Sequence, residues 1–227
     1  MSRPRHALVT GVSSGIGAAI AEQLLQQGWQ VTGFSRTQVR KDHPAFTSVS
    51  IDLFDARSLK QALAALPKVD ALVHAAGMMA AAPLGDLDEE QGTRLWYLHV
   101  QVAQIMANAL QPQMEQGDRI LLIGSRTSRG AAHRSQYVST KAAIVGMARS
   151  WAAELAARGI TVNVIAPGAT ETPMLLQPGR ASSPPQLPPI GRYIKPEEVA
   201  ALAGFVLSPA AAAITGQELV ICGGGSL

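Results

Sequence analysis

Two side chains that could move a proton stand four positions apart, in a segment with a helical pattern. Residues 136–155 predict one long helix, so Tyr137 and Lys141 project from the same face of it. An ammonium beside a phenol favours the phenolate and lowers the tyrosine pKa towards neutrality, which general acid/base catalysis needs. An ordinary exposed helix face would carry the same pair. Tyr137 is therefore a candidate acid/base, and Lys141 is the group that would tune it.

A glycine-rich turn could hold a phosphate. The stretch from Thr10 to Gly17 follows a short apolar run, residues 6–10, and leads into a helical pattern over residues 16–27. Such a turn lets the backbone approach a pyrophosphate, and the helix N-terminus supplies N–H groups and a positive dipole end. Any strand-to-helix turn can be rich in glycine, but the strand before it and the helix after it favour a phosphate cradle.

A serine ends another apolar run. Ser125 follows residues 119–124, at the carboxyl end of a predicted strand, which is where α/β folds build their sites. Its hydroxyl could hydrogen-bond a substrate oxygen, or it could simply cap a turn. Ser128 is the alternative.

The elements that must position these residues alternate along the whole chain. Helical patterns separate seven β-rich runs: residues 6–10, 30–34, 47–51, 70–76, 119–125, 161–166 and 218–222. Repeated βαβ units predict an α/β, doubly wound, seven-stranded parallel sheet with helices on both faces, in a single domain over residues 1–227. Prolines interrupt this rhythm at residues 173–192, which we interpret as a substrate loop.

Composition excludes several classes of protein. The net charge of +3 comes from scattered residues without a cationic stripe, so no nucleic-acid partner is expected. No apolar run is long enough for a membrane span or a signal peptide, which predicts a cytoplasmic protein without a membrane partner. One cysteine excludes an internal disulfide, and no metal site is expected.

Taken together and in order, the motifs resemble the short-chain dehydrogenase/reductase superfamily over nearly the whole chain. They are T-G-x-x-x-G-x-G from Thr10, Asp52, HAAG at residues 74–77, Ser125, YVSTK at residues 137–141, APGATETPM at residues 166–174 and TGQELVICGG at residues 215–224. Each motif is weak alone, whereas their order and spacing are specific.

The resemblance implies a Rossmann-like oxidoreductase that transfers a hydride reversibly between a nicotinamide cofactor and a small carbonyl or secondary alcohol substrate. Tyr137 would be the acid/base, Ser125 would polarise the substrate oxygen, and Lys141 would also bind ribose. A homo-oligomer, dimer or tetramer, is expected. The residues expected at the cofactor are Gly11, Ser13, Ser14, Gly15, Ile16, Gly17, Ser35, Arg36, Asp52, Leu53, Ala75, Ala76, Gly77, Tyr137, Lys141, Pro167, Gly168, Thr170 and Thr172.

The end of the second predicted strand bears on the choice of cofactor. NAD enzymes of this fold usually carry an acidic residue there to bind the ribose hydroxyls, whereas this chain has Ser35 followed by Arg36. This favours NADP(H), because an arginine can fork onto a 2′-phosphate. Ser14 stands where many NADP-preferring relatives carry a cation, which leaves NAD(H) open. Asp52 would hold the adenine, or it could cap the next helix.

At one position the chain departs from the family's catalytic set. His99 stands where relatives carry an asparagine whose main-chain carbonyl holds a water in a proton relay. Any residue supplies a carbonyl, so the relay could persist, but an imidazole could also carry the proton itself. A plain helix histidine is the third interpretation. The HAAG motif similarly has His74 and Ala75 in place of paired asparagines.

Other functions fit less well. Dehalogenating relatives lose the glycine cradle and replace the lysine with arginine, and neither change is present here. A nucleotide-binding protein without catalytic activity remains an alternative, as does an NAD(H)-dependent alcohol or sugar dehydrogenase.

Overall fold

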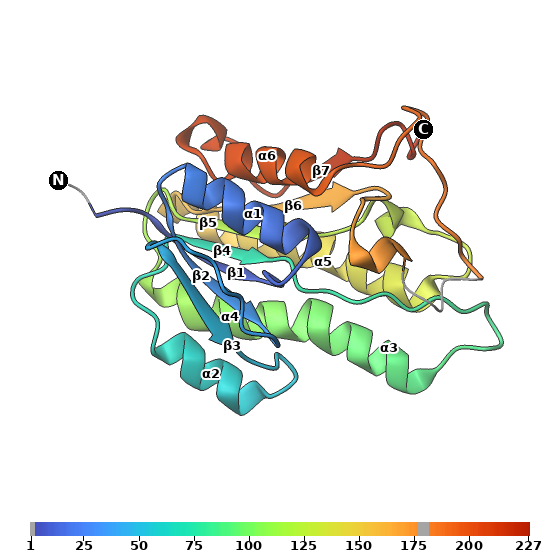
Figure 1. Ribbon diagram of the computed structural model, residues 1–227, viewed down its shortest axis with the longest axis horizontal. Helices are drawn as coiled ribbons and strands as arrows, with labels where there is room; N and C mark the ends of the chain where they lie inside the picture. Colours follow the sequence, from blue (N-terminus) through green and yellow to red (C-terminus); the bar gives the residue numbers. More distant parts are fainter. Residues whose placement is uncertain (1–2, 177–181) are drawn as a thin grey trace.

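All seven β-rich runs form strands of one parallel sheet in the computed structural model, which describes residues 3–176 and 182–227 (Figure 1). Across this part of the chain the strand order is β3-β2-β1-β4-β5-β6-β7. The predicted doubly wound α/β architecture is confirmed. The strands are β1 (His6–Thr10), β2 (Gln30–Ser35), β3 (Phe46–Ser50), β4 (Ala71–His74), β5 (Arg119–Ile123), β6 (Thr161–Pro167) and β7 (Glu218–Ile221).

Helices cover both faces of the sheet. In Figure 1, α1 (Gly15–Gln26) and α6 (Pro196–Val206) lie above it, and α2 (Ala56–Ala64) and α4 (Val102–Leu110) lie below it. The alternation of side chains along β1 explains the two cores, since Ala7 and Val9 pack with the α1 and α6 side and Leu8 packs with the other. The long helix α5 (Ser135–Leu155) contributes its buried face to the core that contains Leu8.

The strand order reverses beside β1. The chain first builds outwards through β2 and β3, then returns so that β4 pairs with the opposite edge of β1. In an open parallel sheet the connections diverge at such a point and leave a crevice outside the carboxyl ends of the strands. The glycine-rich turn after β1 and residues 75–77 after β4 therefore border the crevice.

A π-helical turn interrupts the helical segment that follows β4. The order is α3 (Glu89–Trp96), η1 (Tyr97–Gln101) and α4, and the Val102 N–H bonds to the Tyr97 carbonyl five residues back. The sequence did not predict this turn. Wide turns of this kind often mark functional sites, because they rearrange the carbonyls of a helix.

His74 ties this turn to the sheet. The Thr10 hydroxyl accepts hydrogen bonds from the Ala75 and Ala76 N–H groups, at 3.1 and 3.0 Å, and therefore donates its own proton to His74 Nδ1, at 2.9 Å. His74 Nε2 then donates to the Leu98 carbonyl within η1, at 2.9 Å. The imidazole is neutral in this arrangement, and burial lowers its pKa to about 4.

The start of α2 corrects one expectation. Asp55 caps this helix, since its carboxylate accepts from the Arg57 and Ser58 N–H groups. The alternative that Asp52 caps the helix was wrong, because Asp52 lies one turn too early and, within the residues described, its carboxylate accepts only from the Phe54 N–H, at 3.0 Å.

The proline-rich stretch is partly described. It begins with the short helix η5 (Pro173–Leu176), and its residues 177–181 lie outside the described residues. A single β-bridge between Thr170 and Ile194 joins the chain on either side of it. No helix among the described residues is both long enough and apolar enough to cross a membrane.

Replacing His74 with asparagine should weaken the pH dependence of stability. Because the pKa of His74 is about 4 in the folded chain and 6.5 in its ordinary state, only the unfolded chain binds a proton between these values. The stability that the neutral His74 imidazole contributes is therefore present above about pH 6.5 and is lost as the pH falls towards 4. Between about pH 7 and 5 this group should lower the free energy of unfolding by about 2 kcal/mol.

Denaturant unfolding at the two pH values measures this effect. The His74→Asn protein should lose that share of the pH dependence and should be less stable at pH 7 by about 1–3 kcal/mol, because a buried hydrogen bond is lost. His43→Asn, in a partly exposed loop, is the matched control and should behave as the wild type. An unchanged pH dependence in His74→Asn would refute this account of the buried imidazole.

Candidate active site

Two neighbouring cavities occupy the crevice. One, of about 410 Å³, lies at the carboxyl ends of β4, β5 and β6, and the other, of about 350 Å³, lies along the glycine-rich turn. They share part of their lining, so they adjoin. The shared residues are Ile16, Ala75, Gly77, Met78, Thr172 and Met174.

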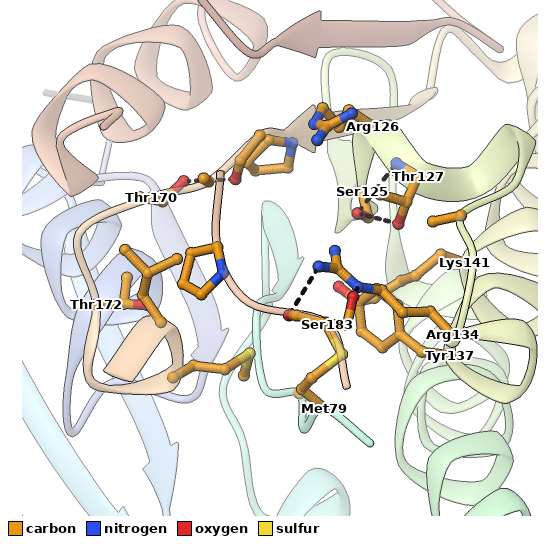
Figure 2. Close-up of a pocket in the computed structure, with 18 of the residues that line it drawn as sticks. Met79, Ser125, Arg126, Thr127, Arg134, Tyr137, Lys141, Thr170, Thr172 and Ser183 are labelled. Carbon is orange, nitrogen blue, oxygen red and sulfur yellow. Dashed lines mark hydrogen bonds between the residues drawn. The ribbon is translucent and has the colours of Figure 1, made fainter. Parts of the chain in front are cut away.

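The four predicted catalytic residues all line the first cavity. Ser125, Tyr137 and Lys141 lie together on one side of it, opposite Thr172 (Figure 2), and His99 completes the set. Each of these four side chains is less than 9% exposed. A residue that follows β5 and residues from η1 and α5 are thus brought together although up to 42 positions separate them in the sequence.

Lys141 lies beside Tyr137, and no carboxylate of the described residues pairs with it. Its Nζ donates to the Ile123 carbonyl at the end of β5, at 2.8 Å, and lies 5.7 Å from the centre of the Tyr137 ring. Burial lowers the pKa of Lys141 from 10.5 to about 7. Near neutral pH the Lys141 side chain can therefore gain or lose a proton, which changes the charge next to the phenol.

Ser125 sits at the start of the short helix η3 (Arg126–Arg129), which places its hydroxyl on the cavity wall. Its Oγ hydrogen-bonds Thr127 Oγ1, at 2.9 Å, and accepts from the Thr127 N–H. Ser128, the alternative from the sequence, donates to the Glu218 carboxylate, at 2.7 Å, and is not among the residues of the cavity wall. The structure thus brings Ser125 to the site and leaves Ser128 outside it.

Both nitrogens of His99 have partners. Its Nε2 accepts from the Met78 N–H, at 3.1 Å, so Nδ1 carries the proton and donates to Thr140 Oγ1, at 2.8 Å. The Thr140 hydroxyl in turn donates to the Tyr137 carbonyl within α5, at 2.8 Å. The His99 ring meets the Tyr137 ring edge-on, and burial lowers the pKa of His99 well below its ordinary value.

The second cavity has the form of a phosphate cradle. Gly11 adopts a φ of +76°, and a Cβ placed on it would lie 3.0 Å from the backbone of Ala76. A Cβ on Gly17 would lie 2.4 Å from the Gly11 carbonyl, so the turn packs tightly onto α1. Ser13 and Ser14 stand exposed at the N-terminus of this helix. A dinucleotide pyrophosphate fits this cradle, because backbone N–H groups and the helix dipole would meet it.

All the residues predicted to contact the adenosine half line this cavity. Ser35 is buried and donates to the Thr37 carbonyl, at 2.7 Å, whereas Arg36 is exposed. Asp52 and Leu53 border the same end. Arg94 also lines it, and sequence reasoning missed this residue, because it lies on α3 and nothing local to it signals a ligand.

An aromatic stack positions Arg94. Its guanidinium lies 4.5 Å from the centre of the Phe54 ring, and that ring stacks on Tyr97, at 5.5 Å between centres. Two cations, Arg36 and Arg94, thus border the second cavity in the part of the chain described.

The predicted nicotinamide-side residues lie across the first cavity from Tyr137. Pro167, Gly168, Thr170 and Thr172 all line it. The Gly168 N–H bonds to the Ile221 carbonyl, at 2.8 Å, and the Thr170 hydroxyl donates to the Gly168 carbonyl, at 3.1 Å. These bonds hold the turn after β6 against β7.

Part of the proline-rich stretch also lines the first cavity, at residues 182–186. Two residues that the sequence did not indicate as loop contacts hold it. His133, with a φ of +62°, donates from Nδ1 to the Ser182 carbonyl, at 2.6 Å. Arg134 donates from Nε to the Ser183 hydroxyl, at 2.5 Å, and from Nη2 to the Ser183 carbonyl, at 3.1 Å.

Acidic and thiol ligands do not gather here. Among the described residues, no group of three histidine, cysteine or acidic side chains could hold a metal ion.

Comparisons with known proteins agree with this geometry. A family model described as enoyl-(acyl carrier protein) reductase matches residues 11–226. The chain is 34% identical to the 3-oxoacyl-(acyl-carrier-protein) reductase FabG of Vibrio cholerae, over 96% of each chain.

Solved structures show the same fold. A short chain dehydrogenase family protein from Francisella tularensis superposes with a TM-score of 0.91 at 26% identity, over 99% of each chain. A blue fluorescent protein from a metagenomic library, solved in complex with NADPH, gives a TM-score of 0.86 at 29% identity, over 98% of each chain. The chain therefore belongs to the short-chain dehydrogenase/reductase superfamily and is an oxidoreductase acting on CH–OH or C=O groups.

Proposed function

We propose that this enzyme transfers a hydride reversibly between NADP(H) and a small carbonyl or secondary alcohol substrate. One observation carries the proposal: the buried set of Ser125, Tyr137 and Lys141 faces a cavity that adjoins the glycine cradle. A dinucleotide that lies along the cradle would reach from one cavity into the other.

The protein's part in the reaction is to orient the substrate and to move a proton. Ser125 would donate a hydrogen bond to the substrate oxygen and polarise the carbonyl. Tyr137 would give its proton to that oxygen during reduction and take it back during oxidation. The neighbouring Lys141 ammonium favours the phenolate form of Tyr137 and would also hold the ribose hydroxyls. When bound, the nicotinamide supplies or accepts the hydride.

Two arginines support NADP(H) over NAD(H). No carboxylate ends β2, where Ser35 stands, and Arg36 follows it at the edge of the cofactor cavity. Arg94 adds a second cation to the same lining. A 2′-phosphate would be met by cations, whereas the paired hydroxyls of NAD would lack the acidic partner they usually have.

We propose a positioning role for His99. Its two hydrogen bonds join the loop after β4 to α5, next to Tyr137. Direct proton transfer through the imidazole would break one of these bonds and protonate a ring whose pKa burial lowers. A relay that uses only the main-chain carbonyl of this residue needs neither change.

The remaining proposals concern organisation. We infer one catalytic domain over residues 1–227, with residues 173–192 as its substrate loop, supported by the place of residues 182–186 in the cavity wall. The resemblance to the family also favours a homo-oligomer, dimer or tetramer.

The Tyr137→Phe variant should lose the proton donor and retain the cofactor site. We expect the rate of ketone reduction to fall by about 1,000-fold, while the dissociation constant for NADPH, measured by fluorescence, stays within about threefold. Tyr193→Phe, away from both cavities, should match the wild type. Full reductase activity in Tyr137→Phe would overturn the assignment.

The Arg36→Leu variant should lose affinity for NADPH selectively. Removing a charged partner of the 2′-phosphate should raise the KM for NADPH by about 10-fold or more and change the KM for NADH by less than about threefold. Arg40→Leu, an exposed arginine outside the cavity lining, is the matched control. If the wild type uses NADH better than NADPH, the preference is wrong.

The His99→Asn variant separates the two roles of this residue. If His99 acts by position and by its carbonyl, kcat should fall by less than about 10-fold, and the pH profile of kcat should keep its shape. If the imidazole carries the proton, the acidic limb of the profile should move by about one pH unit or more. The second result would contradict the positioning role.

A further inference from the structure

The charged side chains that line the first cavity are all basic. Its described lining includes Arg126, Arg134 and Lys141, and no aspartate or glutamate. Lys141 has a place in the proposed reaction, but neither arginine does. The cavity therefore holds two cations that proton and hydride transfer leave unexplained.

The cofactor does not account for these arginines. The pyrophosphate cradle and the adenosine end belong to the second cavity, whose cations are Arg36 and Arg94. Arg126 and Arg134 are absent from that lining and flank Ser125 and Tyr137 on the β5–α5 segment (Figure 2). They belong to the substrate side of the site.

Arg134 is held in place across the cavity. It immediately precedes α5, three positions before Tyr137, and its two bonds to Ser183 tie its guanidinium to the proline-rich stretch. Figure 2 shows this guanidinium beside the Tyr137 ring and inside the cavity. Arg126 is fixed similarly, since its Nη1 donates to the Gly225 carbonyl, at 2.7 Å.

A partly enclosed cationic cavity favours an anionic occupant. A guanidinium matches the planar fork of a carboxylate, or two oxygens of a phosphate, and such charge-assisted bonds strengthen as water is excluded. A neutral substrate would offer a guanidinium no opposite charge in exchange for the water that it displaces. In Figure 2 the Arg134 guanidinium lies beside the Tyr137 ring, whereas Arg126 lies farther from that ring.

We propose that the substrate carries an anionic group, a carboxylate or a phosphate, which Arg134 binds while Tyr137 and Ser125 act on the carbonyl or alcohol. This rests on the proposed function and specifies its substrate class. The overall reaction is the one proposed above, in which a ketone, NADPH and a proton give a secondary alcohol and NADP⁺. The anion takes no part in the bond changes and determines only position and specificity.

Matched pairs of ketones test the proposal. We expect wild-type kcat/KM to favour 2-oxo, 3-oxo or 4-oxo acids over their methyl esters by about 10-fold or more, since only the acids offer Arg134 a carboxylate. Dihydroxyacetone phosphate against dihydroxyacetone gives the same comparison for a phosphate. The Arg134→Gln variant should lose about 10- to 100-fold on the preferred anion and stay within about threefold on the neutral partner.

Three further variants separate the charge from the loop. Ser183→Ala removes a loop contact but retains the arginine, so the preference for the anion should persist. Arg134→Lys retains the charge without the fork and should keep part of the preference. Arg129→Gln, an exposed arginine of the same segment outside the cavity, should match the wild type.

Competitive inhibition measures binding of an anion that the enzyme does not convert. Butanoate should inhibit reduction of a neutral ketone competitively more strongly than butanamide, and Arg134→Gln should abolish this difference. Equal kcat/KM for each anion and its neutral partner, or an equal loss on both in Arg134→Gln, would overturn the proposal and leave the proposed function standing. If no ketone oxidises NADPH, the proposed function fails and this proposal fails with it.

Discussion

A line of hydrogen bonds through two buried histidines joins the sheet to the helix that carries Tyr137. It runs from Thr10 at the end of β1, through His74 at the end of β4, to the π-helical turn, and continues there through His99 and Thr140. Each neutral imidazole donates one hydrogen bond and accepts one, so the direction of every bond is determined. These bonds tie the ends of β1 and β4 to α5 beside the crevice.

The same line explains why burial and function coincide here. A buried imidazole whose two nitrogens are both hydrogen-bonded stays neutral. It therefore holds its neighbours in a fixed arrangement and transfers protons poorly. Lys141 is the contrasting case, since it is buried against a single carbonyl and its pKa falls to about 7. The site thus combines rigid neutral groups, which hold the geometry, with one charge that responds near neutral pH.

Much of this could be predicted from local patterns. The seven strands and the glycine turn have signatures within a few residues of one another, because side-chain alternation and backbone freedom are local properties. The choice of Asp55 over Asp52 as the cap of α2 is local too, but it depends on where the helix begins to within one turn, which patterns resolve poorly.

Other features had no local signal. Within the π-helical turn the Leu98 carbonyl accepts a hydrogen bond from His74, which lies more than 20 positions away in the sequence. Arg94 and Arg134 enter the cavities only because distant segments, Phe54 and Ser183, hold their long side chains in place. In the sequence Arg94 looks like an ordinary surface charge, and Arg134 is one of three arginines near the expected rim of the site, so only the assembled fold shows which cavity each enters.

We propose hydride transfer to a substrate carbonyl in the cavity beside Tyr137. The most direct measurement uses NADPH that carries deuterium on the transferring face of C4, incubated with the ketone that is turned over fastest. Mass spectrometry should then find one deuterium on the carbinol carbon of the product, which the wild-type enzyme should form about 1,000-fold faster than Tyr137→Phe. An alcohol product without deuterium from either face of the cofactor, or no alcohol at all, would contradict the account.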